Sequence, residues 1–380
     1  MSGAYLDNSA TTRPDPRVVE VVLRSFREAY GNPSSLHASG RFARRAVDDA
    51  REKIAAALGA GESEIIFTSG ATEANNLVLR GVCAGRGKHV VTSRVEHPSL
   101  LEPCSRLEKE GREISLVSVD GEGRVDAAEI QSALRPGTAL VSIMWANNEV
   151  GTIQPLLEIA ANKKTLLHSD AAQALGKVPI SLEGIDLLTF SGHKIHGPKG
   201  IGGLFVRKGT RLEPFLLGGG QESGRRGGTE NVALIAGLAE AVDIAVKELP
   251  ENRVRMEEAR RRLVECIQTV PGATLLGSGE GRLPNILNVR FEGVDAEAMV
   301  LAFDVEGIHV SSGSACASLG TEPSHVLLAM GLSREEAKTS LRFSVAADTR
   351  EEELDHAVET IPRVISRLRS VSPSFGEGKK

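Results

Sequence analysis

Three features are scarce in this chain of 380 residues, and each scarcity narrows the range of functions. There are only four cysteines, which stand far apart with no Cys-x-x-Cys pair, so neither a disulfide framework nor a structural zinc site is expected. Basic residues (45) do not outnumber acidic residues (50), and the net charge of -5 argues against nucleic acid or an anionic membrane as a partner.

Long apolar runs are also absent. No stretch of about 18 apolar residues occurs, so no transmembrane helix is expected. Residues 1–7 lack the basic stretch and apolar run of a signal peptide, and together with the sparse cysteines they predict a cytoplasmic location. The composition, 41% hydrophobic and 25% charged, is that of a globular protein, and the length predicts two or three domains.

Glycine is abundant, with 40 residues, and much of it is clustered. The clusters fall at 197–203, 218–220 and 224–228. Glycine allows the backbone to approach a ligand or another chain closely, although most single glycines simply form turns. The polar run 218–228 therefore predicts a functional loop.

Short apolar, β-branched runs alternate with helix-like stretches between residues 34 and 207. The expected strands are 64–68, 89–92, 114–119, 139–144, 165–168, 186–190 and 203–206, and helices are expected at 72–79, 99–109 and 126–134. This alternation predicts an α/β fold with a mainly parallel seven-stranded sheet covered by helices on both faces.

The second part of the chain has a different pattern. Helices are expected at 231–247, 252–270 and 296–305, strands at 285–291 and 339–345, and a last helix from Thr349, with Glu352 completing a capping box. We expect a large domain over 15–250, a smaller α/β domain formed by 1–14 and 251–370, and a flexible tail at 371–380.

Polar residues follow several of the expected strands, where ligands bind in open parallel sheets. The first such strand leads through SGATE (69–73) into a helix, whose N-terminus suits a phosphate, although a plain helix cap is the alternative. No GK[ST] follows, so a nucleotide P-loop is not supported. Later strand ends carry His97, Asn148, Asp170 with Gln173, and Ser191 to Lys194. Their convergence at one edge of the sheet predicts an active site.

Lys194 has the position of a lysine that forms a Schiff base, because it follows a strand and faces the expected phosphate site. Asp170, at a neighbouring strand end, is suited to keep a pyridine nitrogen protonated. His97 is suited to stack on such a ring and to move protons. A metal site on His193 and His196 is the alternative, but no third ligand lies nearby in the sequence.

Six segments together resemble the cysteine desulfurases of the NifS/IscS type, and the likeness spans nearly the whole chain. The segments are SGHKIHGPK (191–199), NNEVGTIQP (147–155), SGSAC (312–316), YLDNSATT (5–12), GATEANN (70–76) and RRGGTEN (225–231). The resemblance implies a class-V aminotransferase-like fold, fold type I, and a homodimer that binds pyridoxal phosphate.

The same resemblance implies a role for each matching residue. It makes Lys194 the Schiff-base lysine, Asp170 the partner of the pyridine nitrogen, Gln173 a donor to the ring hydroxyl, and His97 the stacking and proton-transfer residue. The phosphate would be held by Ala71, Thr72, Ser191 and His193, joined by Thr229 from the other subunit. The substrate carboxylate would be held by Arg342 and by Asn148, which also contacts the cofactor.

Cys316 lies in a run of small residues with nothing to pack against, unlike Cys83, Cys104 and Cys266, which are typical core residues. A thiolate on such a segment is suited to take sulfur as a persulfide and to pass it on. We expect this loop to move between the substrate and an acceptor. The resemblance implies an iron–sulfur scaffold as that acceptor, with Cys316 at most a transient cluster ligand and no resident metal.

The expected reaction converts L-cysteine to L-alanine and leaves the sulfur on Cys316, for iron–sulfur cluster assembly. Two alternatives stay open: a selenocysteine lyase or another pyridoxal-phosphate lyase or transaminase of the same fold, and a non-catalytic sulfur-carrier or scaffold-binding protein. The segment 156–167 and the C-terminus are shorter than in familiar members of the family. These departures concern the identity of the acceptor rather than the chemistry.

Overall fold

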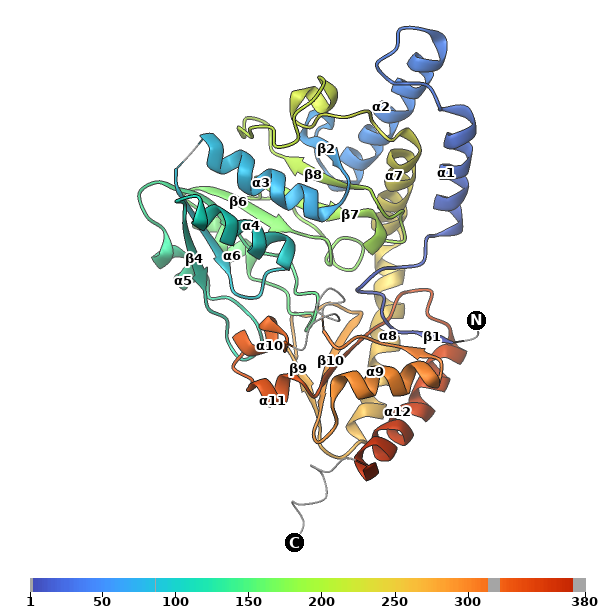
Figure 1. Ribbon diagram of the computed structural model, residues 1–380. Helices are drawn as coiled ribbons and strands as arrows, with labels where there is room; N and C mark the ends of the chain where they lie inside the picture. The colour runs from blue at the N-terminus through green and yellow to red at the C-terminus, as the bar shows by residue number, and fades with distance from the viewer. Residues whose placement is uncertain (1–2, 86, 314–321, 372–380) are drawn as a thin grey trace.

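The computed structural model of the chain describes residues 3–85, 87–313 and 322–371 (Figure 1). Its largest feature is a seven-stranded sheet in the order β2-β8-β7-β6-β5-β3-β4. The strands are β2 (Ile65–Thr68), β3 (His89–Ser93), β4 (Glu113–Val117), β5 (Thr138–Ser142), β6 (Leu166–Asp170), β7 (Leu187–Ser191) and β8 (Gly202–Val206). Only β8 runs against its neighbours, β2 and β7. The predicted mainly parallel sheet is confirmed.

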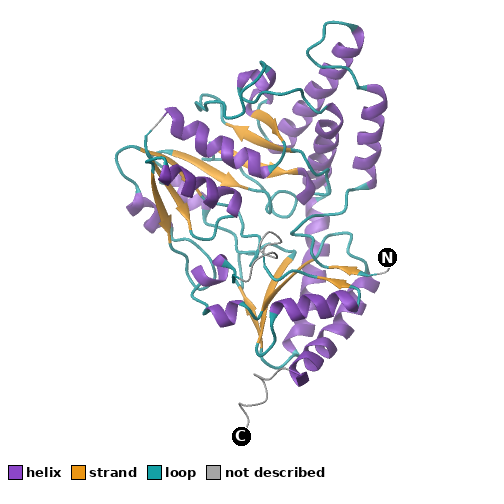
Figure 2. Ribbon diagram, viewed as in Figure 1, coloured by secondary structure: helices purple, strands orange, loops and turns teal. Residues whose placement is uncertain are grey.

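Both faces of this sheet are buried, as the near-continuous apolar strands predicted. Neighbouring residues such as Val90 and Val91 belong to different apolar clusters, because successive side chains point to opposite faces. One face is covered by α3 (Ala71–Gly85) and α4 (Pro98–Lys109). The helices over the other face include α1 (Pro16–Glu28), α2 (Ala38–Leu58), α5 (Ala127–Ala133), α6 (Leu156–Ala161) and α7 (Val232–Lys247). Figure 2 shows the sheet between these two layers.

A second apolar core lies below the sheet in Figure 1. Its elements are β1 (Ala4–Tyr5), α8 (Leu249–Gln268), β9 (Ala273–Leu276), β10 (Ile286–Phe291), α9 (Ala296–Val305), β11 (Ile308–His309), β12 (Ser340–Ser344) and α12 (Glu351–Val371). Ala4 and Leu6 are buried in this core, so the start of the chain packs with its last third. The domain boundaries proposed above stay a prediction.

The remaining helical elements are short. They are α10 (His325–Ala329), α11 (Arg334–Ala337), η1 (Glu62–Glu64), η2 (Gly192–Lys194) and η3 (Gln221–Gly224). Within the described residues, no helix is long and apolar enough to span a bilayer. Cys83, Cys104 and Cys266 are buried, which confirms their expected place in the core.

The predicted capping box at the last helix is wrong by one residue. The helix begins at Glu351, and the Glu353 carboxylate, rather than that of Glu352, accepts a hydrogen bond from the Arg350 N–H (2.9 Å). The Thr349 hydroxyl instead accepts from the Ala346 N–H (2.9 Å) in the preceding turn. Because the Thr349 hydroxyl is used by the preceding turn, the helix begins one residue later, and only the carboxylate half of a capping box is formed.

His168 on β6 is a fully buried titratable group at the centre of the sheet. Its Nδ1 lies 2.8 Å from the Ser142 hydroxyl and its Nε2 lies 3.0 Å from the Thr189 hydroxyl. Burial lowers the pKa of His168 to about 4, while the nearby Asp170 acts in the opposite direction. The ring is therefore neutral at neutral pH.

We expect this histidine to make the protein sensitive to acid. Between pH 6.5 and about 4 the unfolded chain binds a proton at His168 and the folded chain does not, so the free energy of unfolding falls as the pH falls. Over the whole window the effect is about 3 kcal/mol. The His168→Gln variant should lose this part of the dependence, as measured by urea unfolding at pH 7 and pH 5. Equal pH dependence in the two proteins would contradict the assignment.

Candidate active site

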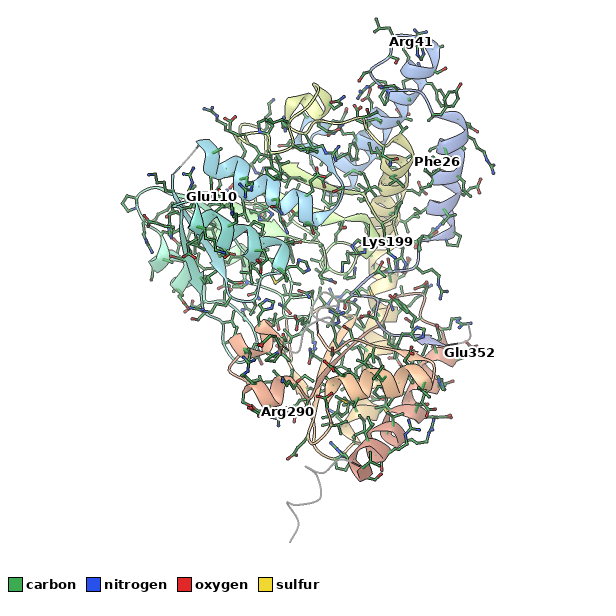
Figure 3. All side chains as sticks on the ribbon, in the orientation of Figure 1. Phe26, Arg41, Glu110, Lys199, Arg290 and Glu352 are labelled. Carbon is green, nitrogen blue, oxygen red and sulfur yellow. The ribbon has the colours of Figure 1, made fainter. Side chains whose placement is uncertain are left out.

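The carboxyl ends of the parallel strands open into a cavity of about 430 Å³, which we call the front cavity. The predicted site residues that line it are Ala71, Thr72, His97, Asn148, Asp170, Gln173, Ser191, His193, Lys194 and Arg342. Lys199, another lining residue, is labelled near the middle of the molecule in Figure 3. Thr229 is exposed and does not line this cavity. Cys316 lies outside the described residues.

Lys194 stands in η2, directly after β7. Its Nζ donates hydrogen bonds to the backbone carbonyls of Ser9 (2.5 Å) and Ala10 (2.8 Å). Ser9 and Ala10 line the cavity as well, so the start of the chain closes one side of the site. The lysine amine is therefore held at the cavity wall by acceptors that a reaction partner would have to replace.

Asp170 ends β6 and is buried. The Asn75 side chain donates to its Oδ2 (2.8 Å), and the Ala172 N–H donates to its Oδ1 (2.9 Å). These two hydrogen bonds hold the Asp170 carboxylate in one orientation at the cavity.

His97 is the N-cap residue of α4, and its Nδ1 accepts a hydrogen bond from the Ser99 N–H (3.1 Å). Burial lowers the pKa of His97, against the opposing effect of Asp170 and together with that of the Lys194 charge. Because Nδ1 accepts in the helix cap, the neutral imidazole carries its hydrogen on Nε2, from which it can be donated.

One corner of the front cavity, at the N-terminus of α3, has the character of an anion site. The N-terminus of α3 presents Ala71 and Thr72, and the helix dipole favours negative charge there. Gly70, just before the helix, has φ of 150°, and a Cβ on the facing Gly202 would lie 2.7 Å from the Gly70 Cα. The close approach of the two backbones requires glycine at 202, whereas position 70 requires glycine because of its positive φ.

Ser191 and His193 stand on the other side of this corner. The His193 Nδ1 lies 3.1 Å from the Thr11 hydroxyl, and burial, followed by the Lys194 charge, lowers the pKa of His193 to about 4. A neutral His193 donates from at most one ring nitrogen. With the Ser191 hydroxyl and the α3 N–H groups, the corner holds donors for a phosphate.

The buried atoms without partners fit a bound cofactor. The Gln173 Nε2 donates to the Ser9 carbonyl (2.9 Å), whereas its Oε1 and the Ser9 hydroxyl lack a partner among the described residues. Unpaired buried polar atoms are rare unless a ligand or water completes them. A phosphorylated pyridine would meet a carboxylate, an amide and a helix N-terminus here, so the residues fit pyridoxal phosphate.

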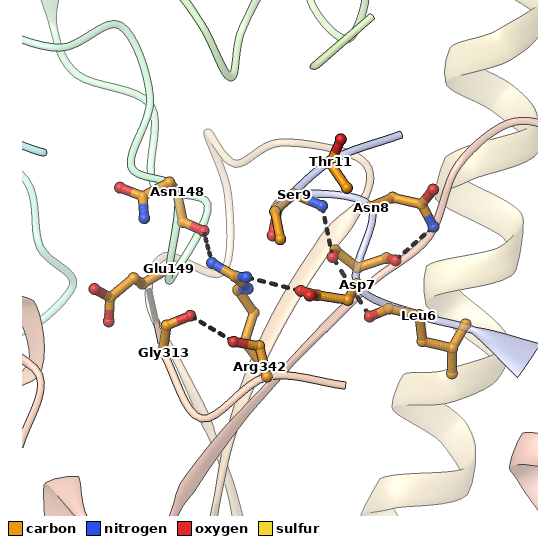
Figure 4. A network of polar contacts seen from close by, with 12 residues as sticks. Leu6, Asp7, Asn8, Ser9, Thr11, Asn148, Glu149, Gly313 and Arg342 are labelled. Atoms are coloured by element: carbon orange, nitrogen blue, oxygen red, sulfur yellow. Dashed lines mark hydrogen bonds and ion pairs between the residues drawn. The ribbon is translucent and has the colours of Figure 1, made fainter. Parts of the chain in front are cut away.

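Arg342 lies at the floor of the cavity and is only 1% exposed. Its Nη2 donates to Asp7 (2.8 Å) and its Nη1 donates to the backbone carbonyl of Asn148 (3.0 Å), as Figure 4 shows. The Arg342 Nε has no partner among the described residues. The guanidinium thus lines the cavity with part of its donor capacity already used by Asp7.

Sequence reasoning assigned no role to four residues that shape the site. Asp7 and Ser9 stand in the segment 5–12, and Asn75 stands in the segment 70–76, both of which carried the resemblance. Glu96 was also missed: its buried carboxylate accepts from the Met144 N–H (3.0 Å) and from the Ser93 hydroxyl (2.7 Å), next to His97. Burial raises the pKa of Glu96 to about 8. Membership of a shared motif was the available signal for the first three.

The alternative of a metal site on His193 and His196 finds no geometric support. His193 lines the front cavity, whereas His196 lines a different cavity and its Nδ1 lies 2.9 Å from the Arg13 carbonyl. No group of three histidine, cysteine, aspartate or glutamate side chains is arranged for a metal in the part of the chain that the structure describes.

Comparison with known proteins identifies close relatives. The model of the aminotransferase class-V family matches residues 4–356. The cysteine desulfurase IscS of Dictyoglomus turgidum is 45% identical over 99% of this chain and 98% of its own length, and the cysteine desulfurase IscS 1 of Archaeoglobus fulgidus is 44% identical over 98% and 99%.

Solved structures agree with these relatives. A NifS-like protein has a TM-score of 0.91 at 41% identity and covers 96% of this chain and all of its own. A protein described as SspA in complex with cysteine has a TM-score of 0.80 at 36% identity, over 90% of this chain and 98% of its own.

Proposed function

The chain belongs to the class-V aminotransferase family and, within it, to the cysteine desulfurases, and on this premise we propose which residues carry each part of the reaction. The enzyme depends on pyridoxal phosphate and removes the sulfur of L-cysteine. The observation that carries the proposal is the meeting of Lys194, Asp170 and His97 from three strand ends at one cavity.

Lys194 is the residue to which the cofactor attaches. Bound pyridoxal phosphate supplies an electron sink for the bonds of the substrate α-carbon. Asp170 would face the pyridine nitrogen, Gln173 the ring hydroxyl, and Ala71, Thr72, Ser191 and His193 the phosphate. The fixed Asp170 carboxylate supports its role. The unpaired Gln173 Oε1 is an acceptor, so it fits a ring hydroxyl that donates to it rather than one that accepts from Gln173.

Proton movement falls to His97 and Lys194. The lowered pKa of His97 leaves its ring ready to take a proton, and the Ser99 N–H holds the ring at one orientation. The Lys194 Nζ donates to the backbone carbonyls of Ser9 and Ala10, which are weakly basic. Either group can therefore deliver a proton within the cavity.

The sulfur passes to the thiol of Cys316. The carbon–sulfur bond of L-cysteine breaks, a sulfur–sulfur bond forms at Cys316, and L-alanine leaves, so that one cysteine and one thiol give one alanine and one persulfide. An acceptor protein then takes the sulfur, and by resemblance to the family this acceptor is an iron–sulfur scaffold.

Replacement of Lys194 tests the cofactor assignment. Borohydride treatment of the wild-type enzyme, followed by peptide mass spectrometry, should locate the reduced cofactor on Lys194. The Lys194→Ala variant should lose this covalent adduct but keep some cofactor through the phosphate contacts. Finding the adduct on Lys199, which lines the same cavity, would refute the assignment.

Replacement of Cys316 separates the desulfurase from its alternatives. Cys316→Ala should abolish sulfide and alanine production from L-cysteine and leave cofactor absorbance unchanged, because the thiol receives the sulfur. Turnover of selenocysteine measured in parallel distinguishes a selenocysteine lyase. Undiminished cysteine turnover in Cys316→Ala would refute this mechanism, and Cys266→Ala, which alters a buried cysteine, is the matched control.

Arg342 is proposed to hold the substrate carboxylate. Arg342→Lys replaces a planar fork of donors by a point charge, so KM for L-cysteine should rise about tenfold or more, with a smaller change in kcat. Asp7→Asn keeps the Arg342 charge and removes its competing carboxylate, so KM should stay unchanged or fall. A fall in kcat with unchanged KM in Arg342→Lys would contradict the role.

The proposal includes a homodimer. Thr229 is exposed and does not contribute to the front cavity of its own subunit. Leu217, in the same glycine-rich segment, is a large apolar side chain that is 78% exposed. Further exposed apolar residues, such as Tyr30 (76%) and Leu36 (89%), stand after α1, close to the end of the molecule where Figure 3 labels Phe26 and Arg41. Such surfaces are typical of subunit contacts.

If Thr229 completes the phosphate site of a partner subunit, Thr229→Val should weaken cofactor binding several-fold in a protein that still sediments as a dimer. Analytical ultracentrifugation and cofactor titration measure the two properties separately. A monomer that binds the cofactor with full affinity would contradict this part of the proposal.

A further inference from the structure

A second cavity, of about 420 Å³, lies behind Lys194 and shares no lining residue with the front cavity. We call it the rear cavity. Its walls are residues 12–17, Lys177, the facing parts of α7 and α8, and residues 345–348. The chain passes from one cavity to the other within one turn, since Lys194 lines the front cavity and His196 lines the rear one. Cavities of this size accommodate small molecules.

Two buried polar side chains in the rear cavity are incompletely bonded. Lys177 is 5% exposed, and among the described residues its Nζ finds one acceptor, the backbone carbonyl of Lys194 (2.7 Å). An ammonium has three donor hydrogens. Asn285 is 1% exposed, and neither its Nδ2 nor its Oδ1 has a partner in the described parts of the chain. Native proteins rarely leave such groups unmatched.

Two of the three carboxylates that line the cavity form ion pairs with the same arginine. Arg17 forms ion pairs with Asp15 (2.7 Å) and with Glu248 (2.5 Å). With one guanidinium and two carboxylates, this cluster has a net charge of -1. Both carboxylates are bound to Arg17, and neither forms an ion pair with Lys177 within the described residues.

The remaining charges favour a negative ligand. Lys177, Arg13 and Arg255 line the cavity and form no ion pair within the described residues. Asp348 is the single carboxylate that is likewise unpaired, and it is exposed at the rim. Over all lining residues, four cations (Arg13, Arg17, Lys177 and Arg255) face three carboxylates, so the balance is one positive charge. Arg13, Arg255 and Asp348 are exposed, whereas Lys177 is buried, so the buried charge of the cavity is positive.

We propose that the rear cavity binds a small oxyanion, a carboxylate or a phosphate, between the Lys177 ammonium and the side-chain amide of Asn285. The oxyanion would accept hydrogen bonds from the unused Lys177 donors and from the Asn285 Nδ2. Burial, followed by the Lys194 charge, lowers the pKa of Lys177 to about 7, and a bound anion would stabilise the charged form.

The position of Lys177 gives the site a connection to catalysis. Its Nζ donates to the backbone carbonyl of Lys194, whose side chain reaches the front cavity. An anion that draws the Lys177 ammonium toward itself competes with that carbonyl. The occupant of the rear cavity therefore acts on the backbone that carries the cofactor-binding lysine.

The test uses enzyme saturated with pyridoxal phosphate, so that the phosphate corner of the front cavity is filled. Isothermal titration calorimetry with inorganic phosphate, and separately with acetate, should find one site per chain. Lys177→Met and Asn285→Ala should each weaken binding about tenfold, the effect of losing a charge-assisted or a buried hydrogen bond. Asp348→Asn should tighten binding, because it removes the unpaired carboxylate.

Lys247→Met is the matched control, since Lys247 is exposed on α7 and outside both cavities, and it should bind like the wild type. Binding of only one of the two anions supports the site and identifies its chemistry. No heat with either anion, or wild-type affinity in both Lys177→Met and Asn285→Ala, would overturn the proposal. If Lys177→Met does not fold, the anion affinities of Asn285→Ala and Asp348→Asn test the proposal. Cofactor absorbance, recorded throughout, reports separately on the front cavity.

Discussion

The hydrogen bonds between Lys194 and the backbone of Ser9 and Ala10 join the two apolar cores of the molecule. They continue in a ladder along the same segment, where the Thr12 N–H donates to the His193 carbonyl (2.9 Å) and the Asp15 N–H to the His196 carbonyl (2.9 Å). Because Ala4 and Leu6 are buried in the second core, this ladder ties the end of β7 to that core. The wall between the front and rear cavities is formed by this contact.

The buried cations of the two cavities, Arg342 and Lys177, have different partners. In the front cavity Arg342 has a carboxylate partner, Asp7, and a backbone acceptor, so its burial is compensated. In the rear cavity Lys177 has only a backbone carbonyl within the described residues, and burial lowers its pKa. A buried cation without a counter-charge is costly, and such groups are found mainly where a ligand or a reaction uses them.

The strands could be predicted from local sequence patterns, because a strand buried on both faces is a continuous apolar run. The apolar runs of β2, β3 and β7 could be recognised without knowledge of their neighbours. Helices α1 and α2 were not anticipated, although the buried residues of α2, such as Ala43, Val47 and Ala50, recur at helical spacing. The cap of α12 was misassigned by one residue, because the choice between Glu352 and Glu353 depends on the turn at Ala346.

The sequence alone determined which chemical groups stand at the strand ends, because all parallel strands of one sheet finish at the same edge. That rule found Lys194, Asp170 and His97. Only the tertiary structure decided which groups those residues contact: Asp7 reaches Arg342 across 335 positions, and Asn75 reaches Asp170 across 95. Hydrogen bonds and pKa values depend on interatomic distances of a few ångströms and on burial. The order of residues along the chain does not specify these distances or this burial.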